Sequence, residues 1–337
     1  MPTPFLLLNE DEIRSCVAVD MKALAAVEDG FARLGRGEVL VPAPIGIDVP
    51  ERQAEVHVKT AYVRGLPAFA VKVASGFYAN AKAGLPVSSG LMIVLSAETG
   101  LPEALLLDNG YLTEVRTALA GAVAAKYLAP ATVRVAGVIG VGMQARYQLR
   151  ALKLVRDFQE VVAFGRKREQ VRTFIADMSD ELGVEVVPAK NPAEVVRRGD
   201  VVVTATPARE PLIAVAALHE GLHITAMGSD GPGKQELDPR IFARADLVVC
   251  DLRSQCARIG ELQHAIAAGT ITAARPVVEL GELAAGRRAG RQSDSEITVC
   301  DLTGVGVQDT AIACFALDRA RARRLGSLQG VGPVPRP

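Results

Sequence analysis

The stretch from Val133 to Leu152 holds the residues whose types and spacing most directly suggest chemistry. A run of apolar, β-branched residues ends at Gly140, and a segment with helical periodicity begins just after Gly142. A pyrophosphate group needs small residues at such a strand–turn–helix junction, because it must approach bare backbone and the unpaired N–H groups of the helix. Ala145 then lets the helix pack closely on the strand. The pattern predicts a dinucleotide site, and a purely structural glycine turn is the alternative.

The end of the next expected strand, 160–166, indicates which dinucleotide is bound. An acidic residue at this position binds the ribose hydroxyls of NAD. The sequence instead continues Gly165-Arg166-Lys167-Arg168 and offers no carboxylate. Arg166, with Lys167 or Arg168, can hold a 2′-phosphate through charge-assisted hydrogen bonds. The sequence therefore favours NADP(H), and a solvated basic turn is the alternative.

Polar residues also follow the fourth and fifth expected strands of this region. Thr204 and Thr206 lie at the end of one strand, and Met227 and Asp230 lie at the end of the other. Nicotinamide and substrate meet at the carboxyl ends of strands beside the switch point of a parallel sheet, so these residues are expected near the cofactor. Asp230 is a candidate general acid or base, and an Asx-turn aspartate is the alternative.

Cationic side chains interrupt apolar segments in the first part of the chain. Lys72 lies in AFAVKVASG, where it either polarises a substrate and transfers a proton from a pocket, or extends to solvent from an edge strand. Lys59 in EVHVKTAYV is a similar but weaker candidate. Arg116 and Thr117 begin an Ala-rich helix, and the planar guanidinium suits a substrate carboxylate. The alternative for Arg116 is an internal salt bridge.

The hydrophobic pattern changes along the chain. Residues 1–110 combine an amphipathic helix over 21–34 with apolar segments broken by Gly, Pro and Asn, which is typical of an antiparallel or mixed sheet. A long Ala-rich helix is expected over 112–129. From residue 133 strands and short helices alternate. The near-continuous apolar strands indicate a parallel sheet that is covered on both faces.

The predicted fold class is therefore α/β, with a doubly wound Rossmann-like domain inserted into a second, α+β domain for substrate binding and dimerisation. The inserted domain is expected at 116–305, and the second domain at 1–115 plus 306–337, because the last amphipathic helix can return to the first segment. Strands of the inserted domain are expected at 133–140, 160–166, 184–189, 200–208, 223–229, 246–252 and 297–302. The Gly- and Pro-rich tail after Gly326 is expected to be disordered.

Length and composition restrict the class of protein. The chain has 337 residues, of which 49% are hydrophobic, and this suits two domains with large cores. Its 38 basic and 38 acidic residues give no net charge, which argues against nucleic acid and membrane partners. No basic leader or long apolar segment occurs, so a cytoplasmic protein is expected. The five cysteines form no CxxC pair and have no neighbouring histidines, so buried thiols and no metal site are expected.

Ordered motifs run along the whole chain. They are VKVASGF with Lys72, LTEVRTALAGAVAAKYLA with Arg116 and Thr117, GVIGVGMQAR, AMGSDGPGKQELD with Asp230, IGELQHAI and GRQSDSEITVCDLTGVGVQDTAIA. Together they resemble the ornithine cyclodeaminase/mu-crystallin family. Within it, the block LLLDNGYLTEVRTA…GVQDTAIA is most similar to the ectoine-utilisation protein C subgroup. The resemblance implies an NAD(P)-dependent enzyme that acts at the α-carbon of a small amino or imino acid, as a homodimer joined through its N-terminal sheets.

The resemblance also implies roles for the residues singled out above. Arg116 and Lys72 would hold the substrate carboxylate with Lys59 beside them, and Lys72 and Asp230 would carry proton transfer. The residues expected to bind the cofactor are Thr117, Gly140, Gly142, Met143, Gln144, Arg166, Lys167, Thr204, Thr206 and Met227.

Two departures from the family pattern favour an imine reductase or amino-acid dehydrogenase. Ornithine cyclodeaminases carry an acidic residue near the position of Lys59, where it meets a side-chain ammonium that a lysine would repel. They also carry an arginine in the segment that here reads VPAPIGIDVP, at 41–50, without one. An ammonia-releasing cyclodeaminase is the first alternative, and a non-catalytic NADPH-dependent ligand-binding protein like mu-crystallin is the second. The subgroup resemblance implies a role in ectoine catabolism.

Overall fold

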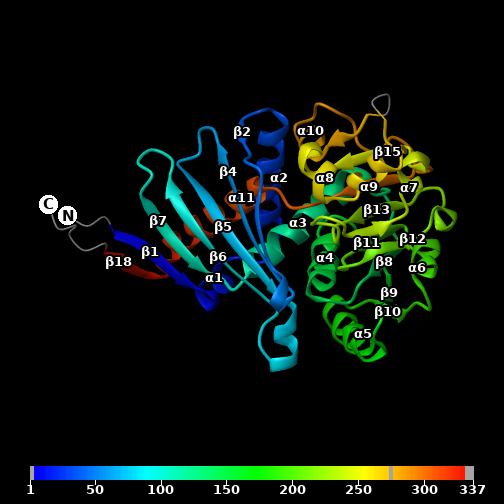
Figure 1. Ribbon diagram of the computed structural model, residues 1–337, viewed down its shortest axis with the longest axis horizontal. Coiled ribbons are helices and arrows are strands. Elements are labelled where there is room, and N and C mark those ends of the chain that lie inside the picture. Colours follow the sequence, from blue (N-terminus) through cyan, green and yellow to red (C-terminus); the bar gives the residue numbers. More distant parts are fainter. Residues whose placement is uncertain (1–3, 273–275, 331–337) are drawn as a thin grey trace. The chain divides into compact units, whose positions relative to one another are not determined.

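The computed structural model describes residues 4–272 and 276–330. The chain forms two compact units, each built around its own large sheet (Figure 1). Unit 1 comprises 1–18, 25–116 and 305–337, and unit 2 comprises 19–24 and 117–304. The expected α/β fold class is confirmed, because one sheet is parallel and Rossmann-like and the other is largely antiparallel.

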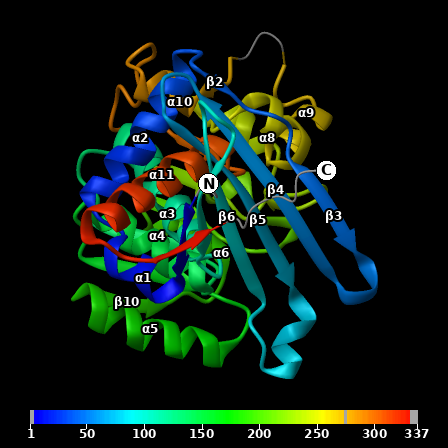
Figure 2. The same ribbon diagram turned by 90° about the vertical axis from the view of Figure 1, so that its left-hand side faces the viewer.

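The sheet of unit 1 has the strand order β18-β1-β7-β6-β5-β4-β2, and β3 pairs with β4. Its neighbouring strands are antiparallel, apart from β1 and β7, which run parallel. Figure 2 shows β3, β4, β5 and β6 side by side. The strands are β1 (Pro4–Asn9), β2 (Val39–Leu40), β3 (Ile45–Val49), β4 (Ala54–Val63), β5 (Ala68–Phe77), β6 (Ser88–Ser96), β7 (Pro102–Leu107) and β18 (Ser327–Gly330).

One face of this sheet is buried because α11 (Gly306–Arg323) packs on β4 and β5. Side chains alternate between the faces of a strand. Ala70 and Lys72 of β5 are therefore buried toward the helix, whereas Phe69 on the opposite face stays partly exposed. The Thr310 hydroxyl of α11 accepts a hydrogen bond from the Ala70 N–H at 3.1 Å and so fastens the helix to the sheet.

The two helices expected early in the chain are confirmed as α2 (Met21–Gly35) and α3 (Tyr111–Leu128). A short helix, α1 (Glu10–Cys16), precedes them, and short 3-10 turns lie at Pro50–Arg52 and Tyr78–Ala83. Most residues of α3 are buried, which explains why its sequence is apolar on nearly every side.

The expectation of a disordered tail after Gly326 is wrong for residues 327–330. These residues form β18, which pairs antiparallel with β1 in the register Pro4↔Gly330 to Leu7↔Ser327. The side chains of β18 are exposed, so hydrophobic patterning could not reveal the strand. Main-chain hydrogen bonds to the edge strand β1 are enough to order it. Residues 331–337 lie outside the described part of the chain.

The sheet of unit 2 has the order β10-β9-β8-β11-β13-β17-β15-β16, and its neighbouring strands are parallel. The strands are β8 (Val135–Ile139), β9 (Glu160–Phe164), β10 (Glu185–Pro188), β11 (Val201–Thr204), β13 (His223–Ala226), β15 (Leu247–Cys250), β16 (Val278–Glu279) and β17 (Thr298–Asp301). All seven expected strands are confirmed, although each is shorter than expected. A small separate sheet pairs β12 (Arg209–Ile213) with β14 (Gln235–Leu237).

Both faces of the parallel sheet are covered, as the apolar strands indicated. The neighbours Val138 and Ile139 of β8 belong to two different hydrophobic cores, one on each face. The helices of unit 2 besides α3 are α4 (Met143–Lys153), α5 (Arg168–Leu182), α6 (Pro192–Arg198), α7 (Arg240–Arg244), α8 (Arg253–Ile259), α9 (Leu262–Ala267) and α10 (Leu280–Ala284), with a 3-10 turn at Val215–Ala217.

Within residues 4–272 and 276–330, no helix is long and apolar enough to cross a membrane. The same residues contain no cluster of His, Cys, Asp and Glu suited to hold a metal ion. All five cysteines are free thiols, and Cys314 is the one among them that is partly exposed.

Candidate functional site

The turn between β8 and α4 has the backbone that a phosphate group requires. Gly140 has a φ of +103°, and a Cβ there would lie 2.5 Å from the Ala205 carbonyl oxygen, so this position needs glycine. Gly142 is the N-cap of α4, and a Cβ there would point into open space. Ala145 is fully buried in the core below. An anion can therefore reach the N–H groups of the first turn of α4.

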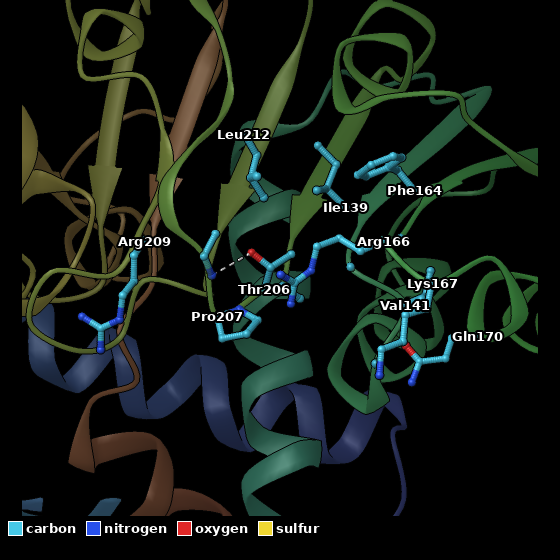
Figure 3. Close-up of a pocket in the computed structure, with 15 residues that line it drawn as sticks. Ile139, Val141, Phe164, Arg166, Lys167, Gln170, Thr206, Pro207, Arg209 and Leu212 are labelled. Carbon is cyan, nitrogen blue, oxygen red and sulfur yellow. Dashed lines mark hydrogen bonds between the residues drawn. The ribbon is translucent and has the colours of Figure 1, made fainter. Parts of the chain in front are cut away.

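A cavity of about 530 Å³ opens beside this turn (Figure 3). Five of the expected cofactor residues line it, namely Gly140, Gly142, Arg166, Lys167 and Thr206. Figure 3 shows the Arg166 side chain extending toward Thr206 and Lys167 drawn beside Val141. Bare backbone, apolar walls and two cations suit a dinucleotide that carries several phosphates.

Gly165 explains why an acid is missing at the end of β9. A Cβ at this residue would lie 2.6 Å from Cγ2 of Val141 and 3.0 Å from Cγ2 of Val171. A side chain at this residue would therefore require the side chain of Val141 to shift. The local packing thus disfavours a carboxylate at position 165.

A buried glutamate that the sequence analysis missed holds the loops after β11 and β13. Glu236 accepts hydrogen bonds from the Thr204 hydroxyl at 2.6 Å and from the Gly228 N–H at 2.9 Å. It also accepts from the N–H and the hydroxyl of Thr206, both at 2.7 Å. Burial raises the pKa of Glu236, and the bonds from the threonines oppose that rise. Thr204 thus supports the loops from below, while Thr206 faces the cavity.

Two further buried acids support Glu236. The Glu261 carboxyl accepts from the backbone N–H of Glu236 at 2.7 Å and of Leu237 at 3.2 Å. Burial, with neighbouring acids, raises the pKa of Glu261 to about 9. Asp301 accepts from the Leu262 N–H at 2.9 Å, and burial raises its pKa to about 8. Burial beside other acids therefore favours the neutral form of both carboxyls.

The other expected cofactor residues do not line the cavity. Gln148 of α4 donates to the Thr117 carbonyl at 3.0 Å and to Gln144 Oε1 at 3.2 Å, which links α3 to the phosphate-binding helix. Met143 is 57% exposed, whereas Met227 is 7% exposed. Gln144 lies in this helix and Thr117 contacts it, and the cofactor roles of all four residues stay predictions.

Unit 1 contains a buried cluster of opposite charges around one aspartate. Asp309 Oδ1 lies 3.2 Å from Lys72 Nζ and 2.9 Å from Arg116 Nε. The Arg116 Nη1 also donates to Gln308 Oε1 at 2.8 Å. The Lys72 and Arg116 side chains are 3% and 5% exposed. Lys72 therefore does not extend to solvent from an edge, and Arg116 makes the internal salt bridge that the sequence left open.

The position of Lys72 changes its chemistry. Its pKa falls to about 7, chiefly because the side chain is buried and also because Arg116 and Lys59 are nearby cations, against the opposing effect of Asp309. Asp108 also interacts with this group, and burial raises its own pKa to about 6. A lysine with a pKa near neutrality can both bind a carboxylate and exchange a proton.

Asp230 lies in unit 2, after β13. Its carboxylate is 2.8 Å from Lys234 Nζ and its side chain is 48% exposed. An ordinary Asx turn would have this carboxylate accept the N–H of residue 232, but Pro232 has none. The arrangement disfavours a turn-forming role and leaves an accessible carboxylate held by one lysine.

The sequence analysis did not single out Asp309, Gln308 or Asp108. The signal available in the sequence was the run Gln308-Asp309-Thr310 at the start of an apolar helix. In the structure all three residues are at most 1% exposed. Three consecutive polar residues that cannot all face solvent indicate internal partners. Asp108 accepts from the Leu112 N–H at 2.7 Å and resembles an ordinary helix-capping residue in the sequence.

Comparison with known proteins places this geometry in a family. The family model of the ornithine cyclodeaminase/mu-crystallin family matches residues 5–324. The chain belongs to this family. The family member named "Uncharacterized cyclodeaminase" from Sinorhizobium fredii is 47% identical over 97% of this chain and 99% of its own length.

Two solved structures of the family superpose over nearly the whole chain. An archaeal alanine dehydrogenase dimer with bound NAD shares 34% identity and covers 97% of this chain and 99% of its own, with a TM-score of 0.89. The Δ1-pyrroline-2-carboxylate reductase of Thermococcus litoralis, in complex with NADH and L-proline, shares 30% identity and covers 96% and 99%, with a TM-score of 0.91. The expected family and the expectation of an NAD(P)-linked enzyme are thereby confirmed at the level of the family.

Proposed function

We propose that this chain is an NAD(P)-dependent oxidoreductase that interconverts a small α-imino acid and the corresponding α-amino acid. The carrying observation is the buried cluster of Lys72, Arg116 and Asp309 in unit 1, in a chain whose unit 2 has a dinucleotide-binding turn. Relatives named as an alanine dehydrogenase and a pyrroline-carboxylate reductase support this assignment.

Each residue of the cluster has its own role in binding the substrate or in proton transfer. The Arg116 guanidinium binds the α-carboxylate of the substrate, and Lys72 binds the same group in its charged form. Asp309 holds both cations in place. Bound nicotinamide cofactor supplies or accepts the hydride. Lys72 and Asp230 are the groups that give a proton to, or take one from, the substrate nitrogen.

The test is the oxidation of NADH and NADPH by the purified chain, followed by absorbance, with cyclic imines and with 2-oxo acids plus ammonium. We expect turnover with at least one of these substrates. Cofactor binding without any turnover would instead indicate a non-catalytic binding protein. Release of ammonia from L-ornithine or L-lysine without net cofactor consumption would indicate a cyclodeaminase.

We further propose that NADPH is preferred to NADH. Arg166 and Lys167 line the cavity, and the end of β9 carries no acidic residue that would repel a 2′-phosphate. One charge-assisted hydrogen bond is worth ~1.5–3 kcal/mol. Replacing both cations, in Arg166→Ala/Lys167→Ala, should therefore raise the NADPH Kd at least about tenfold and leave the NADH Kd nearly unchanged.

Fluorescence titration of the two reduced cofactors measures this preference. Arg172→Ala, at an exposed position of α5, is the matched control and should bind both cofactors as the wild type does. Equal affinities of the wild type for NADH and NADPH would contradict the preference.

Three wider assignments also belong to this proposal. A homodimer is supported by the description of the archaeal relative as a dimer. A cytoplasmic location is supported by the five free thiols. Membership of the ectoine-utilisation subgroup rests on the motif block around Arg116 and Asp309. Turnover of intermediates of ectoine breakdown in the same assay would test this last assignment.

A further inference from the structure

Gln308 is a buried polar residue to which the proposed function gives no role. It is the third residue of α11 and is 1% exposed. Its Oε1 accepts a hydrogen bond from Nη1 of Arg116 at 2.8 Å. Because a guanidinium has only donors, the oxygen of the amide must face Arg116, and the NH₂ group is therefore turned away from it.

The NH₂ group of Gln308 is buried and has no hydrogen-bond partner within the described residues. A buried donor of this kind costs stability and calls for an explanation. A glutamate of nearly the same shape would remove the donor, bind Arg116 through a charge-assisted bond and suit the N-terminus of a helix, although burial of its charge would oppose these gains. The amide differs from that glutamate in offering Arg116 an acceptor without a charge.

The other partner of Arg116 does carry a charge. Asp309 Oδ1 lies 2.9 Å from Nε of Arg116 and 3.2 Å from Nζ of Lys72, so two cations share this carboxylate. Gln308 holds Nη1 of the same guanidinium and adds no negative charge. The two contacts thus fix the plane of the guanidinium without giving it a carboxylate of its own.

The first turn of α11, which carries both partners, is itself held firmly. A Cβ at Gly306 would collide with the carbonyl oxygen of Thr60, so the helix lies directly against the backbone of β4. The Thr310 hydroxyl forms hydrogen bonds with the backbones of β4 and β5. Gln308 and Asp309 lie between these two anchors and are therefore presented from a fixed helical turn.

We propose that Gln308 is a positioning residue of the carboxylate site: it orients the Arg116 guanidinium through an uncharged acceptor and so leaves the charge of Arg116 to the α-carboxylate of the substrate. This role rests on the proposed function, in which Arg116 binds that carboxylate. Gln308 acts through Arg116 and takes no part in hydride or proton transfer. Substrate binding therefore depends on the acceptor and on its neutrality, whereas the reaction of the bound substrate does not.

Two variants test the two requirements separately. Gln308→Met keeps the length of the side chain but offers no acceptor of comparable strength, and Gln308→Glu keeps the acceptor but adds a negative charge. KM and kcat are measured with Δ1-pyrroline-2-carboxylate and with 2-oxobutyrate plus ammonium. Both variants should raise KM about tenfold or more, as the loss of one charge-assisted hydrogen bond implies, and leave kcat nearly unchanged.

A double variant shows whether Gln308 acts through Arg116. The ammonium of a lysine is a point charge and has no plane to orient. In an Arg116→Lys background, Gln308→Met should therefore lower kcat/KM much less than it does in the wild type. Equal losses in the two backgrounds would show that Gln308 acts independently of Arg116 and would overturn the inference.

The controls and the contrary outcomes separate this role from the proposed function. Gln159→Met and Gln159→Glu, at an exposed position before β9, should keep the wild-type KM. A folded variant at position 308 that keeps the wild-type KM overturns the role of Gln308 and leaves the proposed function standing. Failure of the wild type with every amino and imino acid overturns the proposed function itself.

A crystal structure of the wild type with 2-oxobutyrate decides the matter if neither variant at position 308 folds. We expect Arg116 to contact both Gln308 Oε1 and the carboxylate of the ligand. A carboxylate bound away from Arg116, or a Gln308 side chain turned away from the guanidinium, overturns the inference.

Discussion

Lys72 is the residue whose environment most changes its chemistry. Four charged groups face it, namely Asp309 of α11, Arg116 of α3, Lys59 of β4 and Asp108 just before α3. Because burial brings the pKa of Lys72 to about 7, its charge is lost as the pH rises through neutrality. The pKa of Asp108, about 6, places its ionisation below that range.

We therefore predict that carboxylate binding weakens between pH 7 and pH 9. The neutral amine loses a charge-assisted hydrogen bond worth ~1.5–3 kcal/mol. The Kd of a simple ligand such as 2-oxobutyrate, measured by calorimetry, should thus rise roughly 5- to 30-fold. Lys72→Met should bind weakly at both values and show little change between them. A wild-type Kd that stays flat over this range would show that Lys72 does not bind the carboxylate.

Asp230 carries a second prediction at this scale. Asp230→Asn keeps the size of the side chain but cannot take up a proton, so kcat should fall at least about 100-fold. Cofactor affinity and melting temperature should change little, because the side chain is half exposed and its ion pair with Lys234 is local. An active variant with a lower melting temperature would indicate that Asp230 is structural and that Lys72 or water carries the proton transfer.

The sequence located one half of the charge cluster and missed the other. Lys72 and Arg116 stood out because a cation inside an apolar segment needs a reason. Asp309 did not, since an aspartate in the first turn of a helix is common and usually faces solvent. Its true partners lie far away in the sequence, and only the packing of α11 on β4 and β5 brings them together.

At the scale of elements, the strand–turn–helix around Gly140 was the most predictable part. Its requirements are local: a positive φ, open space at Gly142 and a small residue under the helix. The loops after β11 and β13 were less predictable, and the sequence extended both strands too far. Glu236 is remote in sequence from Thr206. It accepts hydrogen bonds from the N–H groups of Thr206 and Gly228, so these groups do not continue the hydrogen bonding of the sheet.

Glu236 should therefore be intolerant of even a conservative change. In Glu236→Gln an NH₂ group would replace an oxygen that accepts from either the Thr206 N–H or the Gly228 N–H, and two donors would then face each other. Stability should fall by about 1–3 kcal/mol. NADPH affinity should fall as well, because the loop that carries Thr206 shifts.

Thermal denaturation and fluorescence titration measure these two effects. Glu210→Gln, at an exposed position of β12, is the matched control and should leave both unchanged. A Glu236→Gln variant that melts and binds NADPH like the wild type would show that the loops hold their shape without this carboxylate.

At the scale of the whole molecule, the hydrophobic periodicity of the sequence predicted the covered faces of the parallel sheet. It did not predict what covers the outer face of the other sheet. Continuous apolar strands predicted a parallel sheet with two covered faces, and the two cores around β8 confirm it. The sheet of unit 1 was harder to predict, because its strands carry apolar residues on both faces whereas α11 covers only one face. The sequence alone does not say what the other face meets.

The register shows how far that second face extends. Ile45 and Ile47 of β3 lie opposite Val58 and Val56 of β4, and Val58 in turn lies opposite Val73 of β5. These residues alternate with Lys59 and Lys72, so they share the face turned away from α11. Ile45 and Ile47 are 60% and 52% exposed. An extended apolar sheet face of this kind is typical of a subunit interface.

We therefore predict that a second copy of the chain covers this face and that Ile47→Glu separates the copies. A buried carboxylate without a partner opposes association by several kcal/mol. In light scattering coupled to size exclusion, the mass should fall from twice the 35.5 kDa of one chain to 35.5 kDa. Leu328→Glu replaces an apolar side chain that is 73% exposed on β18, away from the face, and should keep the dimer. A monomeric wild type would contradict the predicted dimer, and an Ile47→Glu variant that stays dimeric would place the interface elsewhere.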